Sequence, residues 1–101
     1  MDTVDQILIE TRTIAIVGLS PNPTRESHRV GRYLKAIGYR IVPVNPTVLE
    51  VLGEKSYPDL SSVPEPVDLV DIFRRSEDVP PVVEQAIQIG AKYVWMQDGI
   101  I

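Results

Sequence analysis

The sequence predicts an α/β fold with three layers and a mainly parallel sheet. Short apolar runs, each followed by a turn and then by residues at helical spacing, alternate along the chain of 101 residues. The first run is continuously apolar, as expected for a strand that is covered on both faces. The crossovers between strands should be right-handed. The expected strands cover residues 14–17, 39–44, 67–73 and 91–96.

The composition fits one globular domain, which we expect to span 1–101. Hydrophobic residues make up 44% of the chain and charged residues 24%. The chain has no cysteine, which excludes disulfides and a thiol nucleophile and fits a cytoplasmic location. It has one histidine, His28, too few for a multi-histidine metal site. No apolar run reaches the roughly 20 residues of a membrane span, and the N-terminus is acidic, unlike a signal peptide.

Basic residues gather in the first half of the chain. Residues 1–45 hold six basic and four acidic side chains, whereas residues 46–101 hold four basic and ten acidic ones. Nucleic-acid binding usually needs a broad basic face, whereas a small anionic ligand needs only a local one. We therefore expect a small-molecule nucleotide ligand, and neither a nucleic acid nor a membrane as partner.

The strongest functional signal lies in residues 13–34. The strand is followed by Gly18 and a polar loop with two prolines, and Ser27 is expected to cap a helix from about His28 to Ile37. Backbone N–H groups in such a turn, with about half a positive charge at the helix N-terminus, attract anions. Three arginines lie in or just after the loop: Arg25, Arg29 and Arg32. This pattern predicts a phosphate-binding turn.

The remaining elements follow from local patterns. An amphipathic helix is expected over 3–10, a helical turn over 47–53, a brief edge strand over 55–57, and a helix from Pro80 that ends at Gly90. Gly31 lies within the first long helix, where it should allow close packing of the helix on the sheet. The chain stops after the last strand, so we expect a fold without the usual final helix and strand. Either the protein is trimmed at this point, or a second copy or another chain covers that face.

A dinucleotide-dependent oxidoreductase is the first alternative, and the turns argue against it. Ligands of open α/β sheets bind outside the carboxyl ends of the strands. The dinucleotide fingerprint requires three glycines and an acidic residue about 20 positions later. Here only Gly18 is present, prolines follow at positions 21 and 23, and the second strand ends in Asn45. A nucleotide with an additional phosphate, bound by arginines, fits better than NAD.

Five segments together resemble the small coenzyme A-binding proteins: IAIVGLSPNP, HRVGRYL, GYRIVPVNP, VDLVDIFRR and GAKYVWMQDGI. These are Rossmann-like domains, similar to the coenzyme A-binding N-terminal domain of succinyl-CoA synthetase α-subunits. The resemblance covers residues 13–101 and implies that coenzyme A or an acyl-CoA lies across the carboxyl edge of the sheet. The implied binding residues are Gly18, Ser20, Arg25 and Ser27 at the phosphates, Val44, Asn45 and Pro46 beside the nucleotide, and Phe73, Arg74 and Gln97 along the rest of the cleft.

No catalytic constellation is present in the sequence. It offers no cysteine, no histidine–aspartate–serine grouping and no metal-ligand cluster. This favours a non-catalytic binding or regulatory module. The alternative is a nucleotide-dependent oxidoreductase or an acyl-CoA enzyme whose catalytic part lies on another chain or domain.

Overall fold

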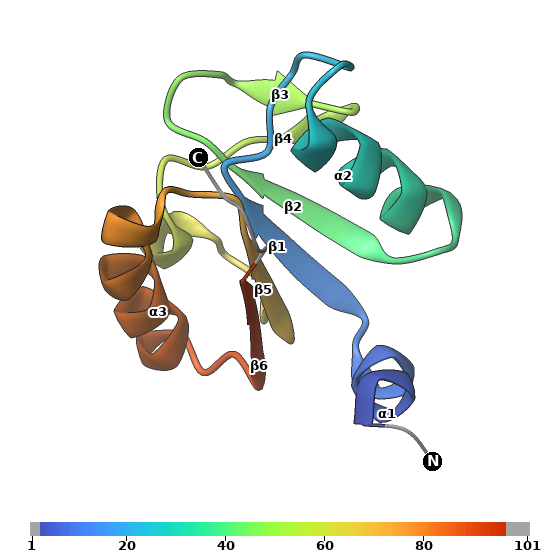
Figure 1. Cartoon of the computed structure of the whole chain (residues 1–101), viewed down its shortest axis with the longest axis vertical. Coiled ribbons are helices and arrows are strands. Elements are labelled where there is room, and N and C mark those ends of the chain that lie inside the picture. Colours follow the sequence, from blue (N-terminus) through green and yellow to red (C-terminus); the bar gives the residue numbers. More distant parts are fainter. Residues whose placement is uncertain (1–2, 97–101) are drawn as a thin grey trace.

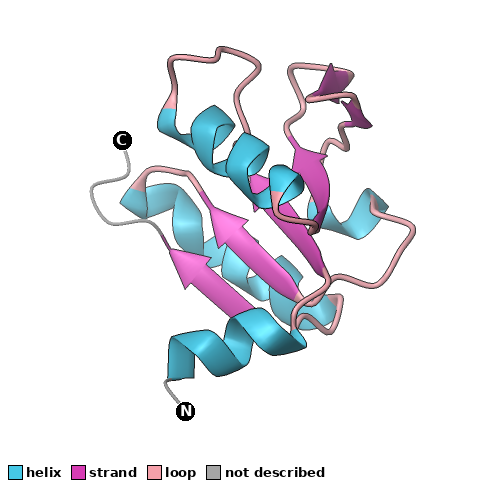
Figure 2. Cartoon of the chain, turned by 90° about the vertical axis from the view of Figure 1, so that its right-hand side faces the viewer, coloured by secondary structure: helices cyan, strands magenta, loops and turns pink. Residues whose placement is uncertain are grey.

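A four-stranded parallel sheet with helices on both faces forms the molecule (Figure 1). The computed structural model describes residues 3–96. The strands are β1 (Thr13–Val17), β2 (Arg40–Val44), β5 (Leu69–Ile72) and β6 (Tyr93–Met96), in the spatial order β2-β1-β5-β6. The predicted three-layer α/β architecture is confirmed, and Figure 2 shows the sheet between its helices.

Three helices surround this sheet. They are α1 (Thr3–Glu10), α2 (Glu26–Ala36) and α3 (Val79–Gln88), the last with prolines in its first turn as predicted. A small antiparallel pair, β3 (Glu50–Val51) and β4 (Glu54–Lys55), follows β2, and two short 3-10 turns cover Leu60–Ser62 and Ser76–Asp78. From β1 the chain first adds β2 on one side and later β5 on the other. The strand order therefore reverses at β1, which is where ligands bind in open α/β sheets.

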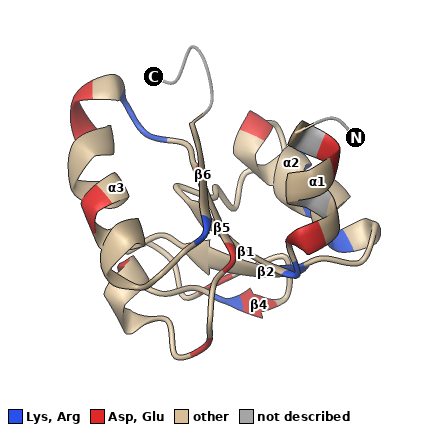
Figure 3. Cartoon of the chain, turned by 90° about the horizontal axis from the view of Figure 1, so that it is seen from below, with Lys and Arg blue, Asp and Glu red and all other residues tan. Residues whose placement is uncertain are grey.

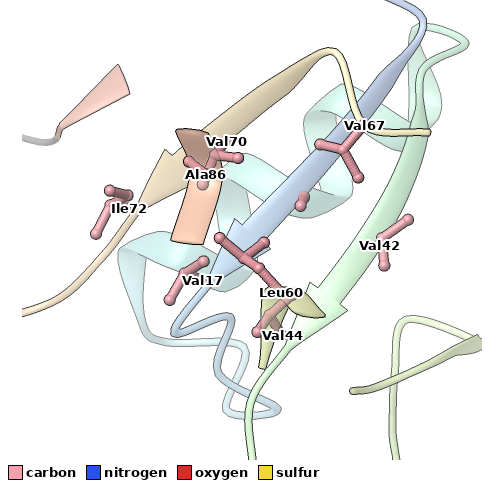
Figure 4. Close-up of a cluster of buried hydrophobic side chains, with 9 residues drawn as sticks. Val17, Val42, Val44, Leu60, Val67, Val70, Ile72 and Ala86 are labelled. Atoms are coloured by element: carbon pink, nitrogen blue, oxygen red, sulfur yellow. The ribbon is translucent and has the colours of Figure 1, made fainter. Parts of the chain in front are cut away.

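Both faces of β1 are buried because each carries its own apolar cluster. Ala15 and Val17 belong to the cluster under α3 (Figure 4). The other buried members of this cluster are Val42, Val44, Leu60, Val67, Val70, Ile72 and Ala86. Ile14 and Ile16 point to a second cluster, which Leu34 of α2 and Ile7 of α1 cover. The continuous apolar run in the sequence is thus explained by helices on both faces.

Gly31 allows α2 to lie close to the second cluster. A Cβ atom at this position would lie 3.0 Å from Leu19 Cδ1, 3.2 Å from Leu52 Cδ1 and 3.4 Å from Cδ1 of Ile16 in β1. The expectation that Gly31 permits close helix–sheet packing is confirmed.

The amino ends of the strands are tied together by Asp68. Its carboxylate accepts hydrogen bonds from the backbone N–H groups of Arg12, at 2.9 Å, and Thr13, at 3.0 Å. Both bonds lower the pKa of Asp68, and the bond from Thr13 has the larger effect. Nearby, the Tyr93 hydroxyl donates to Glu10, which joins α1 to β6 and lowers the pKa of Glu10.

The prediction of a helical turn over 47–53 is wrong, because β3 and β4 form a hairpin there. Leu52 has φ +55° and Gly53 has φ +77°, and two successive positive φ values reverse the chain in a tight hairpin turn. Lys35 holds this turn through a 2.6 Å bond to the Leu52 carbonyl and a 3.0 Å ion pair with Glu54. Figure 3 shows charges of both signs on β4.

The predicted edge strand over 55–57 is present only in part. β4 ends at Lys55, and Tyr57 forms an isolated parallel bridge with Val44. At the other edge of the sheet, Trp95 and Met96 of β6 are 37% and 55% exposed. Whether another chain covers this face stays a prediction.

Candidate functional site

The turn after β1 lies at the centre of the carboxyl edge and has room only for glycine at its first position. Gly18 has φ +87°, and a Cβ atom there would lie 2.2 Å from the carbonyl oxygen of Phe73, at the end of β5. On the other side, Gly18 N–H donates to the carbonyl of Val44, the last residue of β2, at 2.9 Å. Gly18 therefore lies where the ends of three strands meet.

The loop that follows is closed by hydrogen bonds onto α2. Ser27, only 6% exposed, accepts a 3.0 Å bond at its hydroxyl from the Ser20 N–H. The Ser20 carbonyl accepts from His28 Nδ1 at 2.9 Å, so this nitrogen carries the proton, because a carbonyl oxygen can only accept. The Ser20 hydroxyl accepts from Asn22 N–H at 3.0 Å.

The prediction that Ser27 caps the helix is wrong. The helix begins at Glu26, its N-cap residue is Arg25, and no side chain caps it. The Ser27 hydroxyl serves the loop instead, because Ser20 lies opposite the first helical turn. The hydroxyl accepts the bond from the Ser20 N–H and keeps its own proton for a further hydrogen bond.

The N-terminus of α2 presents open hydrogen-bond donors. Within residues 3–96, the backbone N–H groups of Glu26, Ser27 and His28 form no hydrogen bond. The first N–H groups of a helix have no partner within the helix, and the helix dipole adds positive potential there. Arg25 is exposed beside them and forms no ion pair within the described part of the chain. These groups could together receive a phosphate.

The turn after β2 contributes Asn45 and the exposed Pro46, whereas Val44 is only 2% exposed and points into the cluster under α3. Asn45 Oδ1 accepts from the backbone N–H of Thr47 at 3.0 Å and from its hydroxyl at 2.7 Å. Asn45 Nδ2 donates to the carbonyl of Leu19, in the first turn, at 3.0 Å. Both polar atoms of the Asn45 side chain thus form hydrogen bonds within the protein, and Pro46 is exposed beside them.

The turn after β5 approaches the same place. The Phe73 N–H donates to Val17 at 2.8 Å, and its side chain packs partly buried on the cluster under α2. Arg74 is half-buried. The remaining predicted residue, Gln97, lies outside the described residues.

The structure thus brings the first three predicted turns to one edge, with Gly18 touching both neighbours. Sequence reasoning missed the tie between Leu19 and Asn45 and the contact of His28 with Ser20. The tripeptide Asn-Pro-Thr occurs at 22–24 and again at 45–47 and could have indicated that the two turns are alike, but no pattern in the sequence indicates the bond between Asn45 and Leu19.

A hollow lies at the opposite, amino edge of the sheet. It has a volume of about 580 Å³ and is lined by Thr11, Arg12 and residues 37–40. Its one charged group on the sheet, Arg40, is already paired with Glu54 and Glu65, and their carboxylates raise the Arg40 pKa. This hollow lies away from the strand carboxyl ends, so we regard the carboxyl edge as the better candidate.

Metal-ligand clusters and membrane spans are not found in the described part of the molecule. No group of three or more histidine, cysteine, aspartate or glutamate side chains converges there. No helix in residues 3–96 is both long and apolar enough to cross a bilayer.

The fold defines a Rossmann-like α/β domain, and the turn after β1 is its candidate anion site. The CoA binding domain family matches residues 12–101, and the chain belongs to this family. The protein YneT of Bacillus subtilis is 42% identical over 98 residues, which are 97% of this chain and 73% of YneT.

Solved structures agree with this assignment. A protein from Pyrococcus horikoshii OT3 superposes with a TM-score of 0.93 at 42% identity, over 97% of this chain and 69% of that one. The dinucleotide forming acetyl-coenzyme A synthetase 1 of Ca. Korarchaeum cryptofilum, in complex with phosphate and ADP, superposes with a TM-score of 0.80 at 33% identity. That match covers 88% of this chain and 20% of the synthetase, so related domains also occur inside larger proteins.

Proposed function

We propose that this chain binds coenzyme A or an acyl-CoA at the carboxyl edge of its sheet, as a binding or regulatory module without catalysis of its own. The observation that carries the proposal is the family match over 12–101, and the open N-terminus of α2 supports it. The pyrophosphate would lie at the turn formed by Gly18 and Ser20 and at the open N–H groups of α2. The nucleotide would lie beside Pro46, and the rest of the ligand along Phe73 and Arg74.

Two further positions from the sequence analysis take different roles in this proposal. Val44 would contribute its backbone, because its side chain is in the core. Gln97 would border the far end of the cleft, as the resemblance implies.

A second candidate function rests on the match to the synthetase. This chain would supply coenzyme A to an acyl-CoA enzyme whose catalytic part lies on another chain or domain. The related domain in the Ca. Korarchaeum synthetase is one fifth of a larger chain. Both candidates require the same ligand site, and an activity that arises only in the presence of a second protein would favour this one.

Calorimetric titration with coenzyme A, dephospho-coenzyme A and NAD tests the proposed ligand. We expect coenzyme A to bind and NAD to bind at least tenfold more weakly, because no acidic side chain stands at the end of β2 to receive the ribose hydroxyls of NAD. Equal affinities for coenzyme A and NAD would overturn the proposal.

The Arg25→Ala variant tests where the phosphates lie. One charge-assisted hydrogen bond contributes about 1.5–3 kcal/mol, and solvent at this exposed side chain reduces that to about 1 kcal/mol. We therefore expect coenzyme A affinity to fall about fivefold. Arg32→Ala is the matched control, because Arg32 is another exposed arginine of α2, almost two turns further along. If both variants bind coenzyme A like the parent protein, the phosphates lie elsewhere.

A further inference from the structure

Two turns at the carboxyl edge share the tripeptide Asn-Pro-Thr and the same internal hydrogen bonds. In the turn after β1, Asn22 Oδ1 accepts from the N–H of Thr24 at 3.0 Å and from its hydroxyl at 2.8 Å. In the turn after β2, Asn45 Oδ1 accepts from the same two groups of Thr47, at 3.0 and 2.7 Å. The two asparagines therefore shape their own turns in the same way.

Their amide nitrogens differ. Asn22 is exposed, and its side-chain nitrogen donates no hydrogen bond within residues 3–96. Asn45 Nδ2 donates at 3.0 Å to the carbonyl of Leu19, a residue with 0% exposure that lies 26 positions earlier in the chain. Asn45 thus connects the turn after β2 to the turn after β1.

The bond from Asn45 holds one particular peptide group, the one between Leu19 and Ser20. The oxygen of this peptide accepts from Asn45, and its N–H donates to the Ser27 hydroxyl at 3.0 Å. Both ends of the peptide are therefore engaged, and its plane is set by β2 on one side and by α2 on the other. This peptide lies one residue beyond Gly18, in the turn where we propose that the pyrophosphate binds.

Asn45 is itself held firmly at the edge of the sheet. Its N–H donates to the Tyr57 carbonyl at 2.9 Å, and its own carbonyl accepts from the Ser56 hydroxyl at 3.0 Å. Ser56 is buried, with 7% exposure. A side chain that is anchored in this way can transmit the position of β2 to the neighbouring turn.

We propose that Asn45 is a positioning residue: its amide fixes the Leu19–Ser20 peptide so that the turn after β1 is preorganised for phosphate, and it does not itself contact the ligand. An aspartate could not take this role, because a carboxylate cannot donate to the Leu19 carbonyl. The part of this inference that concerns the ligand rests on the proposed function, whereas the tie between the turns does not. Preorganisation raises affinity by removing the ordering that binding would otherwise require.

The tie is tested first without ligand, by NMR amide hydrogen exchange on the full chain. In Asn45→Ala, we expect the N–H groups of Gly18 and Ser20 to exchange about five- to tenfold faster than in the parent protein, the loss expected for one hydrogen bond. Thr47→Val is the control, because it removes the hydroxyl bond to Asn45 Oδ1 and leaves Asn45 Nδ2 intact. It should leave the exchange rates of Gly18 and Ser20 within about twofold of those in the parent protein.

Coenzyme A titration of the same two variants tests the consequence for binding, at a temperature where circular dichroism shows both to be folded. We expect Asn45→Ala to bind about five- to tenfold more weakly, and Thr47→Val to bind within about twofold of the parent protein. Unchanged exchange at Gly18 and Ser20 in Asn45→Ala would overturn the tie. Faster exchange with unchanged affinity would overturn its role in binding. A parent protein that fails to bind coenzyme A would refute the proposed function, while the exchange result would still decide the tie.

Discussion

Substituting Gly18 by alanine should damage both the fold and the site, and the structure allows the size of the effect to be worked out. At φ +87° an alanine is strained by about 1–2 kcal/mol. Its Cβ atom would also lie 2.2 Å from the Phe73 carbonyl oxygen, so the ends of β1 and β5 must move apart. Overpacking of this kind costs about 1–3 kcal/mol. The free energy of unfolding should therefore fall by about 2–5 kcal/mol, the sum of these two contributions.

Gly90→Ala separates the two contributions. Gly90 has φ +80°, close to that of Gly18, but a Cβ atom there would meet nothing within 4 Å. Its cost should be the backbone strain alone, about 1–2 kcal/mol. The difference between the two variants then measures the close approach of β1 and β5.

Urea unfolding followed by circular dichroism measures both free energies. Coenzyme A titration at a temperature where both variants are folded measures the site. We expect Gly18→Ala to bind at least tenfold more weakly, because the turn must shift, and Gly90→Ala to bind normally. Equal losses of stability in the two variants would refute the reasoning about the crowded turn.

Two other substitutions test the framework around the site. Asp68→Ala should lower the free energy of unfolding by about 1–3 kcal/mol at pH 7, since two backbone N–H groups lose a charged acceptor. The Asp68 pKa is lower in the folded state, so the contribution of Asp68 to the free energy of unfolding is complete above the ordinary carboxyl pKa of about 3.9 and is lost as the pH falls through the folded value. A difference in unfolding free energy between the variant and the parent protein that stays constant down to pH 2 in urea titrations would contradict this. Gly31→Val should lower the free energy of unfolding by about 1–3 kcal/mol, because even its Cβ would lie 3.0 Å from Leu19 Cδ1. An unchanged free energy in the same urea assay would contradict this, because it would show that α2 can move away from the sheet.

The sheet was predictable because its signal is local. The run from Ile14 to Val17 has no polar residue, and the structure explains this by apolar clusters on both faces. Each strand is joined to the next parallel strand by a segment that includes a helix or hairpin, so the crossover topology followed from the order of elements. The same reasoning located the turns that meet at the carboxyl edge.

The errors arose where distant residues decide the conformation. Serine is a common helix N-cap residue, but the Ser27 hydroxyl accepts a hydrogen bond from the Ser20 N–H across the loop. Leu52 adopts φ +55°, which is rare for a leucine. Its carbonyl accepts a hydrogen bond from Lys35, and the Leu52 side chain lies against Gly31. Gly53 signals that the chain turns here, but no local pattern indicates a positive φ at Leu52, so the hairpin was predicted as a helical turn.

Asn45 illustrates the limit for the site itself. The absence of an acid at this position was readable and argued against NAD. Its contact with Leu19 joins residues 26 positions apart and required the structure. The sequence could therefore locate the candidate site, whereas the division of roles within it required three-dimensional contacts.

NMR chemical-shift mapping with coenzyme A tests the central claim most directly, because the molecule offers two edges that a ligand could occupy. We predict that the largest shifts fall on the backbone amides of Gly18, Ser20 and residues 26–28, at the carboxyl edge. Shifts concentrated instead on Arg12 and residues 37–40, which line the hollow of about 580 Å³ at the amino edge, would contradict the claim.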